Sequence, residues 1–373
     1  MTAPEAESAL GPRALCIGPQ SPPVTGQAVV HERMIKLIAR QGFIVTSINT
    51  APYSLRGSRS KRIVRLLSAL FQQIRLTTTR PYSFLYITMD AGPGMYFQCL
   101  IALLARLTRN QIIAHHHSYY YINQKANNFR LFCLFVSPTV VHVVNSETMA
   151  RDMRSTYPKI GKIFAIRNIS FAPEPTKNRH GRERPDKLVL GHLSNLCEPK
   201  GIRLVAEVIE ACHEARLPVA LKLGGPAIDD VAEAAIERLR QAGVDFAHLG
   251  AVAADGKGEF YRSIDLFLFP TLYKVEATPL VLHEAQAFGV PILALRRGSI
   301  DHETFGPAAY IVDRPEDFVE RAVTLIRAYL SDPDRYCRDV TQTAEFYTAR
   351  RGAASGDLRR LLETLRINKR AGT

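Results

Sequence analysis

The sequence predicts an α/β protein with two doubly wound parallel sheets. Short apolar runs typical of buried parallel strands alternate with helical patterns, and this alternation occurs twice along the chain. Residues 171–186 separate the two series and, being rich in Pro and Arg with little apolar patterning, resemble a linker. The 373 residues also exceed the size at which one hydrophobic core stops growing. We therefore predict a first domain of residues 1–172, joined by a crossing helix of residues 350–373, and a second domain of residues 173–349.

The first domain is expected to begin with a strand, a turn-rich loop and a helix. An apolar run at residues 14–18 is followed by the proline-rich stretch 19–26. The helical spacing that comes next is carried by Val29, Met34, Leu37 and Ile38. Gly26 is a candidate for close approach of the backbone to a ligand, although an ordinary turn glycine explains it equally well.

Residues 60–76 predict a basic amphipathic helix. Basic side chains at 61, 62, 65 and 75 lie off the apolar stripe of this helix. The stripe is formed by Ile63, Leu66, Leu67, Leu70, Phe71 and Ile74. We expect the stripe to cover the sheet and the basic edge to meet solvent or anionic lipid.

Similar apolar runs predict the remaining strands. They are residues 43–48, 84–89, 111–115, 140–145 and 163–166 in the first domain, and 188–193, 220–225, 266–269 and 310–312 in the second. Ser146 directly follows one of these strands and is the expected N-cap of the next helix.

Three consecutive histidines, His115, His116 and His117, lie at the end of the strand at 111–115 and directly after it. Neighbours on an extended chain point to opposite faces, so the three cannot ligate one metal ion together. Ligands of α/β proteins bind at the carboxyl ends of strands, which favours His117 as a ligand-facing residue. His115 and His116 are expected to pack around it.

The second domain opens with the strand at 188–193, followed by Asn195, Lys200 and Gly201. A lysine beside a glycine at a helix start suits a diphosphate, because the ammonium adds charge to free backbone N–H groups. The later segment 248–252 is a turn that ends at Val252.

The most informative stretch is residues 265–291. Thr278 is the expected N-cap of a helix at 280–288, with Pro279 at its first position and a left-handed Gly289 after its end. The free N–H groups at Leu280 and after it predict an anion site. Glu276 and Glu284 bracket that site.

The charge of the chain is concentrated in its first half. Residues 1–170 hold 20 Lys and Arg against 6 Asp and Glu, whereas the remainder holds 28 against 29. The first half is therefore +14 and the second −1, which matches the overall +13. Such a basic half indicates a polyanion partner: nucleic acid, anionic lipid or a phosphorylated substrate.

Other features exclude several classes. The six cysteines show no CxxC or Cys/His metal spacing and predict reduced core residues of a cytosolic protein. The first residues lack the basic start and apolar stretch of a signal peptide. The most apolar stretches, 95–107 and 129–144, are too short or too interrupted to span a bilayer. A nucleic-acid interface is disfavoured because basic and aromatic residues are not interleaved.

The spacing Glu276, seven residues, Glu284 resembles the signature of retaining glycosyltransferases of the GT-B fold, family-4 type. Lys200 and Gly201 resemble the end of that family's Gly-Arg-Leu, three residues, Lys-Gly motif, but Asn195 stands where the family commonly has Arg. The resemblance covers most of the chain and is strong at residues 191–291. It implies two Rossmann-like domains facing a cleft.

The resemblance also implies roles for individual residues. Donor binding would fall to Gly26, Asn195, Lys200, Val252, Thr278, Leu280 and Glu284. Transfer would fall to His117, Glu276 and Lys200, without a required metal or other cofactor. In this family the residue matched by Glu284 takes the ribose, and the residue matched by Glu276 faces the transferred sugar.

We thus predict a retaining, hexosyltransferase-like enzyme that uses a UDP-sugar, with a GDP-sugar as the second choice. Its acceptor would be lipid-linked or a glycan, in the synthesis of cell-surface polysaccharide or glycolipid. It would be cytoplasmic and held peripherally on an anionic membrane, at the inner face. Alternatives are a GT-B nucleotide-sugar epimerase and a catalytically silent GT-B subunit at the membrane.

Overall fold

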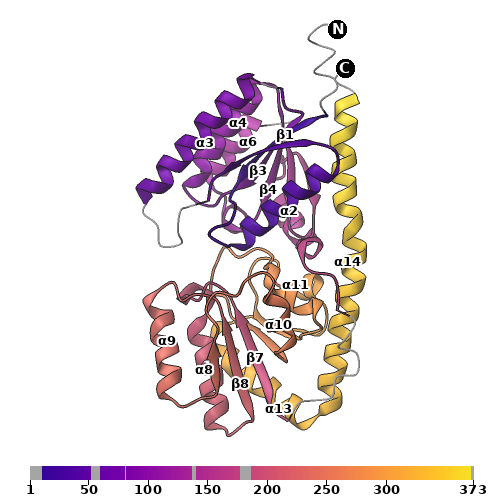
Figure 1. The fold of residues 1–373 in the computed structure, drawn as a ribbon. Coiled ribbons are helices and arrows are strands. Elements are labelled where there is room, and N and C mark those ends of the chain that lie inside the picture. Colours follow the sequence, from indigo (N-terminus) through magenta and orange to yellow (C-terminus); the bar gives the residue numbers. More distant parts are fainter. Residues whose placement is uncertain (1–10, 52–58, 80, 137–139, 177–185, 371–373) are drawn as a thin grey trace. The chain divides into compact units, whose positions relative to one another are not determined.

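The computed structural model describes residues 11–51, 59–79, 81–136, 140–176 and 186–370 (Figure 1). The chain forms two compact units. Unit 1 consists of Met1–Arg167 and Ala354–Thr373, and unit 2 consists of Asn168–Ala353. The boundaries predicted from the sequence were residues 172 and 350.

Unit 1 holds a six-stranded, entirely parallel sheet in the order β2-β1-β3-β4-β5-β6. This doubly wound order confirms the predicted fold class for the first domain. Its strands are β1 (Arg13–Gly18), β2 (Ile44–Asn49), β3 (Phe84–Met89), β4 (Gln111–His116), β5 (Val141–Val144) and β6 (Lys162–Ala165). Its helices are α2 (Gly26–Arg40), α3 (Arg59–Thr79), α4 (Gly94–Leu107), α5 (Tyr120–Asn123), α6 (Asn127–Val136) and α7 (Glu147–Thr156).

Two helices of unit 1 begin at side-chain caps. Thr25 accepts a hydrogen bond from the N–H of Ala28 at the start of α2. Ser146 accepts one of 3.0 Å from the N–H of Met149 at the start of α7, as predicted. Each cap satisfies a backbone donor that has no partner inside its helix.

The two faces of this sheet carry different helices. Helices α3, α4 and α6 lie side by side on one face and α2 lies on the other (Figure 1). All six residues of β3 are buried between these layers, which explains why this strand is apolar on both sides.

The prediction for the helix at 60–76 was wrong about its apolar side chains. Leu66 and Leu70 are half-buried toward the sheet, but Ile63, Leu67 and Phe71 are 57%, 58% and 68% exposed. The apolar residues span an arc wider than a helix can bury against one sheet, so half of the arc faces outward.

Further apolar side chains are exposed on the neighbouring helices. We call the exposed apolar side chains of α3, α4 and α6 the apolar face. It consists of Ile63, Val64, Leu67, Phe71, Ile74, Tyr96, Leu100, Leu107 and Leu134.

Unit 2 holds a second six-stranded parallel sheet, in the order β12-β11-β10-β7-β8-β9. Its strands are β7 (Leu188–Leu193), β8 (Val219–Gly224), β9 (Phe246–His248), β10 (Leu266–Phe269), β11 (Ile292–Leu295) and β12 (Ala309–Val312). Its helices are η1 (Asn168–Phe171), η3 (Glu198–Lys200), α8 (Ile202–Glu214), α9 (Asp230–Gln241), α10 (Lys257–Arg262), α11 (Leu280–Ala287), α12 (His302–Phe305), η4 (Pro315–Asp317) and α13 (Phe318–Ser331). Strands β9 and β11 were not predicted from the sequence.

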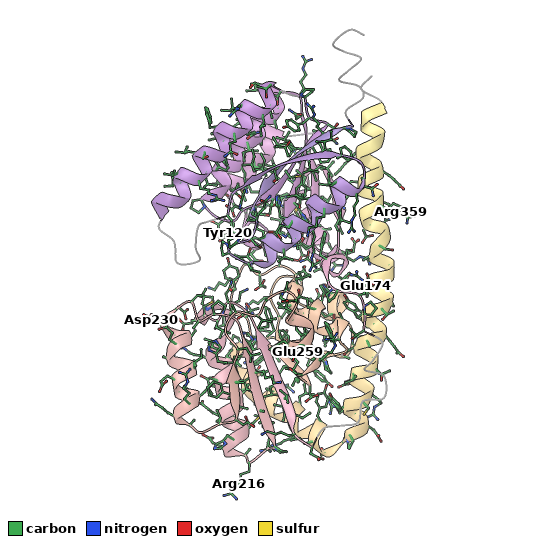
Figure 2. The ribbon with its side chains drawn as sticks, in the orientation of Figure 1. Tyr120, Glu174, Arg216, Asp230, Glu259 and Arg359 are labelled. Carbon is green, nitrogen blue, oxygen red and sulfur yellow. The ribbon has the colours of Figure 1, made fainter. Side chains whose placement is uncertain are left out.

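The last helix, α14 (Pro333–Arg370), contributes to both units. Within unit 2, Arg351 donates hydrogen bonds of 2.7 Å to the carbonyls of Ile169 and Ala172 and pairs with Glu174, which Figure 2 labels. Within unit 1, Arg167 donates a hydrogen bond of 2.6 Å to the buried carboxylate of Asp357. One continuous helix therefore anchors the residues on both sides of the boundary between the units.

In the part of the chain that the structure describes, no helix is both long enough and apolar enough to cross a membrane.

Candidate active site

The start of α11 differs by one residue from the prediction. Pro279, with φ −63° and ψ 127°, is itself the N-cap, and Leu280 is the first helical residue. The extended ψ of Pro279 keeps Thr278 outside the helix, so the predicted Thr278 cap is wrong. The Thr278 carbonyl accepts a hydrogen bond of 2.6 Å from the Asn168 side chain. Its hydroxyl is buried and has no partner among the described residues.

The end of α11 agrees with the prediction. Gly289 has a φ of +65° and its N–H donates to the carbonyl of Gln286 at 2.9 Å. This left-handed position closes the helix. The helix is thus short and fixed at both ends, and its N-terminal N–H groups stay free of intrahelical partners.

Lys200 and Glu276 form an ion pair near this helix. The Lys200 ammonium lies 2.5 Å from Oε2 of Glu276, and the Thr271 hydroxyl donates to the same oxygen at 3.3 Å. The ammonium is also 5.1 Å from the ring centre of Tyr273, within range of a cation–π interaction. Two residues far apart in the sequence are therefore brought together, as the prediction of one site required.

Gly201 follows Lys200 with a φ of +79°. A side-chain carbon at this position would fall on the carbonyl oxygen of Pro270. Glycine is needed here both for the left-handed backbone and for the close approach of the chain to β10.

We expect Gly201→Ala to lower the free energy of unfolding by roughly 2–5 kcal/mol, from left-handed strain plus the clash with Pro270. Gly243→Ala is the matched control, because Gly243 has a φ of +64° and open space around it. That variant should lose only the strain of about 1–2 kcal/mol. Urea denaturation measures both, and equal losses would show that the clash has no effect.

Glu284 lies on α11 and is 4% exposed. Its carboxylate accepts hydrogen bonds from the Lys257 ammonium at 2.9 and 3.1 Å and from the Tyr261 hydroxyl at 3.0 Å. Burial, and then the charge of Glu284, raise the pKa of Tyr261 well above its usual range, so its hydroxyl stays a donor. Both partners lie on α10, which can be found in Figure 2 by the labelled Glu259.

Sequence reasoning missed Lys257 and Tyr261. They are four residues apart and therefore share a helix face, which is a local signal for a joint role. The spacing is informative only once residues 257–262 are known to be helical, and this six-residue segment is too short to show helical periodicity.

Asn195 and Val252 follow strands β7 and β9, which lie on either side of β8, and both are half-buried. The turns that carry them are packed around Gly225, whose N–H donates to the Gly250 carbonyl at 2.6 Å. Gly225 has a φ of +114°, and a side-chain carbon there would meet the carbonyl of Ser194. The structure thus brings these two turns together at the carboxyl edge of the sheet.

Gly26 and His117 belong to unit 1. Gly26 is the exposed first residue of α2, and a side-chain carbon added there would have no other atom within 4 Å. His117 follows β4 and is half-buried, and its Nδ1 lies 3.3 Å from Nδ2 of Asn145. His115 and His116 are fully buried with partners on opposite faces of the sheet, Tyr86 for His115 and Tyr121 for His116.

Burial keeps these three imidazoles neutral. It lowers the pKa of His115 to about 4 and the pKa values of His116 and His117 well below the usual range. Among the residues that the structure describes, no group of three or more His, Cys, Asp or Glu side chains is arranged to hold a metal ion.

Residues 187–328 match the family model described as glycosyl transferases group 1. No curated protein matches the sequence. The match includes Lys200, Glu276 and Glu284.

Solved structures resemble both units together at low sequence identity. Sucrose-phosphate synthase from Thermosynechococcus elongatus has a TM-score of 0.72 at 14% identity, with 96% of this chain and 100% of that chain covered. A glycosyltransferase from Rickettsia africae ESF-5 has a TM-score of 0.69 at 13% identity, with 95% and 98% covered. Anabaena HepE in complex with UDP-glucose has a TM-score of 0.64 at 14% identity, with 94% and 99% covered.

These neighbours confirm the predicted GT-B fold of two Rossmann-like domains. With the match of residues 187–328, they support a glycosyltransferase of the GT-B fold.

Proposed function

We propose that this protein is a retaining glycosyltransferase that moves a hexosyl group from a UDP-sugar to a lipid-linked or glycan acceptor. The observation that carries the proposal is the pair of lysine–glutamate contacts, Lys200 with Glu276 and Lys257 with Glu284, beside the free N-terminus of α11. The product would serve cell-surface polysaccharide or glycolipid synthesis.

The diphosphate of the donor is assigned to the start of α11. The N–H groups of Leu280 and Val281 have no partner inside the helix, and the helix dipole favours an anion there. The buried Thr278 hydroxyl lacks a partner among the described residues, and a phosphate oxygen would supply one. Lys200 would add a positive charge that stabilises the departing diphosphate without a metal ion.

The choice of UDP-sugar draws on HepE, which was solved with UDP-glucose. A GDP-sugar is the second choice, because the residues assigned to the diphosphate would not distinguish one nucleobase from another. Backbone groups near Val252 would meet the nucleobase, and Gly26 would approach the phosphates. Glu276 and His117 would position the transferred sugar.

A thermal-shift screen with UDP-, GDP-, ADP- and CMP-sugars tests the proposal. A ligand at about 100 times its Kd should add about 2.7 kcal/mol to the free energy of unfolding. A chain that no nucleotide sugar stabilises would not be this enzyme.

Glu284 is assigned to the donor ribose. We expect Glu284→Ala to weaken UDP binding by roughly 1–3 kcal/mol, the range for a hydrogen bond to a charged group. Calorimetry measures the change. Glu259→Ala is the control, because Glu259 is an exposed acid on the neighbouring α10. Unchanged affinity in a folded Glu284→Ala protein would contradict the assignment.

Asn195 favours a second candidate, a catalytically silent GT-B subunit. A neutral side chain at this position removes one cationic phosphate contact that the resemblance leads us to expect. A nucleotide sugar that stabilises the protein but is never consumed with any acceptor would support this candidate. Release of an isomeric nucleotide sugar without an acceptor would instead identify an epimerase.

We also propose that unit 1 binds peripherally to the anionic inner face of the cell membrane. The apolar face exposes large side chains on adjacent helices, and exposed apolar patches are typical of membrane and protein interaction sites. The same half of the chain has a net charge of +14, which complements anionic lipid. The side chains of Arg59, Lys61 and Arg62 lie outside the described residues.

A further inference from the structure

Lys257 and Glu284 form an ion pair within unit 2, between α10 and α11 (Figure 1). The Lys257 ammonium donates to both carboxylate oxygens of Glu284, at 3.1 Å to Oε1 and 2.9 Å to Oε2. The Tyr261 hydroxyl donates to Oε2 at 3.0 Å. The two oxygens of this carboxylate therefore have different surroundings.

The carboxylate of Glu284 keeps one acceptor position for a ligand. Each carboxylate oxygen accepts about two hydrogen bonds. Among the described residues, Oε2 accepts from Lys257 and Tyr261, whereas Oε1 accepts only from Lys257. The remaining acceptor position is thus on Oε1, beside the ammonium.

The ammonium of Lys257 keeps at least one donor. A lysine head group carries three N–H donors, and Glu284 takes at most two of them. In the part of the chain that the structure describes, Lys257 makes no other hydrogen bond. Its side chain is 25% exposed, whereas that of Glu284 is 5% exposed. A ligand therefore reaches the pair from the lysine side.

Packing places this pair next to the turn assigned to the nucleobase. Lys257 follows that turn, which ends at Val252, in the sequence. A side-chain carbon on Gly224, the last residue of β8, would lie 3.0 Å from the Val252 side chain and 3.5 Å from the Phe260 ring of α10. The nucleobase turn and α10 thus pack against the same strand end.

The sequence uses the same combination of residues twice in unit 2. Lys200 and the glycine after it precede α8, and this lysine pairs with Glu276. Lys257 and the glycine after it begin α10, and this lysine pairs with Glu284. The first lysine is already assigned to the donor, so the second is a candidate for the same ligand.

We propose that Lys257 contacts the donor nucleotide directly, and that Lys257 and Glu284 together bind the vicinal diol of its ribose. One hydroxyl donates its proton to Oε1 of Glu284. The oxygen of the neighbouring hydroxyl accepts an N–H from Lys257. The identification of the diol as a ribose rests on the proposed function, which assigns Glu284 to that sugar.

The polarity of the pair selects a diol over other ligands. The donor and the acceptor lie side by side, with the ammonium 3.1 Å from Oε1. Two adjacent hydroxyls satisfy both groups, since one donates while the other accepts. A phosphate dianion has no proton for the carboxylate, and an ammonium ligand has no acceptor for the lysine. The pair also carries no net charge that would favour an ion.

Wild-type protein and deoxy nucleotides provide the first test. UDP, 2′-deoxy-UDP and 3′-deoxy-UDP contain no hexose, so calorimetry with them measures the contacts of the ribose alone. Each deoxy analogue should bind roughly 10–100-fold more weakly than UDP, the range for one hydrogen bond to a charged group. Equal affinities for all three would overturn the proposal without the need for any variant.

Lys257→Met separates a direct contact from mere support of Glu284. Without the ammonium, one of the two deoxy analogues should bind within about twofold of UDP, while the other keeps its loss. Tyr261→Phe is the comparison, because it removes a hydrogen bond to Glu284 but no group assigned to the ligand. It should change the affinity for all three nucleotides by the same factor.

Arg262→Met is the charge control. Arg262 is an exposed cation on the same short helix, and its guanidinium lies over the Phe288 ring. Its removal lowers the charge of α10 by the same amount as Lys257→Met. The affinity ratios among the three nucleotides should stay unchanged in this variant.

The remaining outcomes are also decisive. If Lys257→Met weakens all three nucleotides by one factor, the lysine only holds Glu284 and the inference is wrong, while the proposed function stands. If it instead weakens UDP-glucose about tenfold relative to UDP, the diol belongs to the hexose and the ribose assignment is overturned. If the wild-type protein binds neither UDP nor UDP-glucose, the proposed function itself fails.

Discussion

Lys200→Ala should reduce kcat by about 10²–10³-fold, the usual effect of losing one group that stabilises charge in the transition state. The negative charge on the diphosphate grows as the glycosidic bond breaks. The loss in kcat should therefore exceed the loss in affinity for UDP. Steady-state kinetics and calorimetry on the same variant measure the two quantities.

Lys187→Ala is a suitable control for this variant. Lys187 is an exposed lysine that forms an ion pair with Asp245. It precedes β7, whereas Lys200 follows the other end of that strand. Its removal should change neither kcat nor affinity. If Lys200→Ala retains full turnover, the diphosphate is stabilised elsewhere and the assignment of this lysine is wrong.

Neutralising Arg59, Lys61, Arg62 and Arg65 together should weaken binding to anionic vesicles by about three orders of magnitude. Each basic residue near an anionic leaflet contributes on the order of 1 kcal/mol. This loss should disappear at high salt, because salt screens the attraction between basic residues and anionic lipid. Sedimentation with vesicles of phosphatidylglycerol and phosphatidylcholine measures it.

The exposure of Leu67 and Phe71 adds a second arm to this experiment. Burying each side chain in lipid would contribute roughly 1.5–3 kcal/mol, so replacing both with serine should weaken binding at low and at high salt alike. Leu249→Ser is the control, because Leu249 is an exposed leucine of unit 2. If neither set of substitutions weakens vesicle binding, the partner of the basic half is a polyanion other than anionic lipid.

Local patterns predicted much of the fold. Buried parallel strands are continuous apolar runs, so most strands were located within a residue or two, and Gly289 marked the end of α11. Strand β11 is masked in the sequence by Pro291, which signals the end of α11, although the apolar residues 292–295 follow it. Strand β9 was missed as well, because its three residues, Phe246–His248, leave too short a pattern for strand periodicity.

The missed site residues depend on distant contacts. Lys257 and Tyr261 contact Glu284, which is 27 and 23 residues away from them in sequence. The position of the cap before α11 depends on Asn168, 110 residues from Thr278. The outward half of α3 was misjudged because apolar spacing identifies a helix but not how much of it the sheet covers.

The division of unit 1 between two stretches of chain has a consequence for protein synthesis. The ribosome makes residues 168–353, all of unit 2, before it reaches the part of α14 that belongs to unit 1. Until then Arg167 lacks the Asp357 carboxylate that it contacts in the finished fold. Domains generally fold as units in the order of synthesis, but here the unit that begins first is completed last. The nascent first domain therefore lacks its last helix throughout the translation of the second domain.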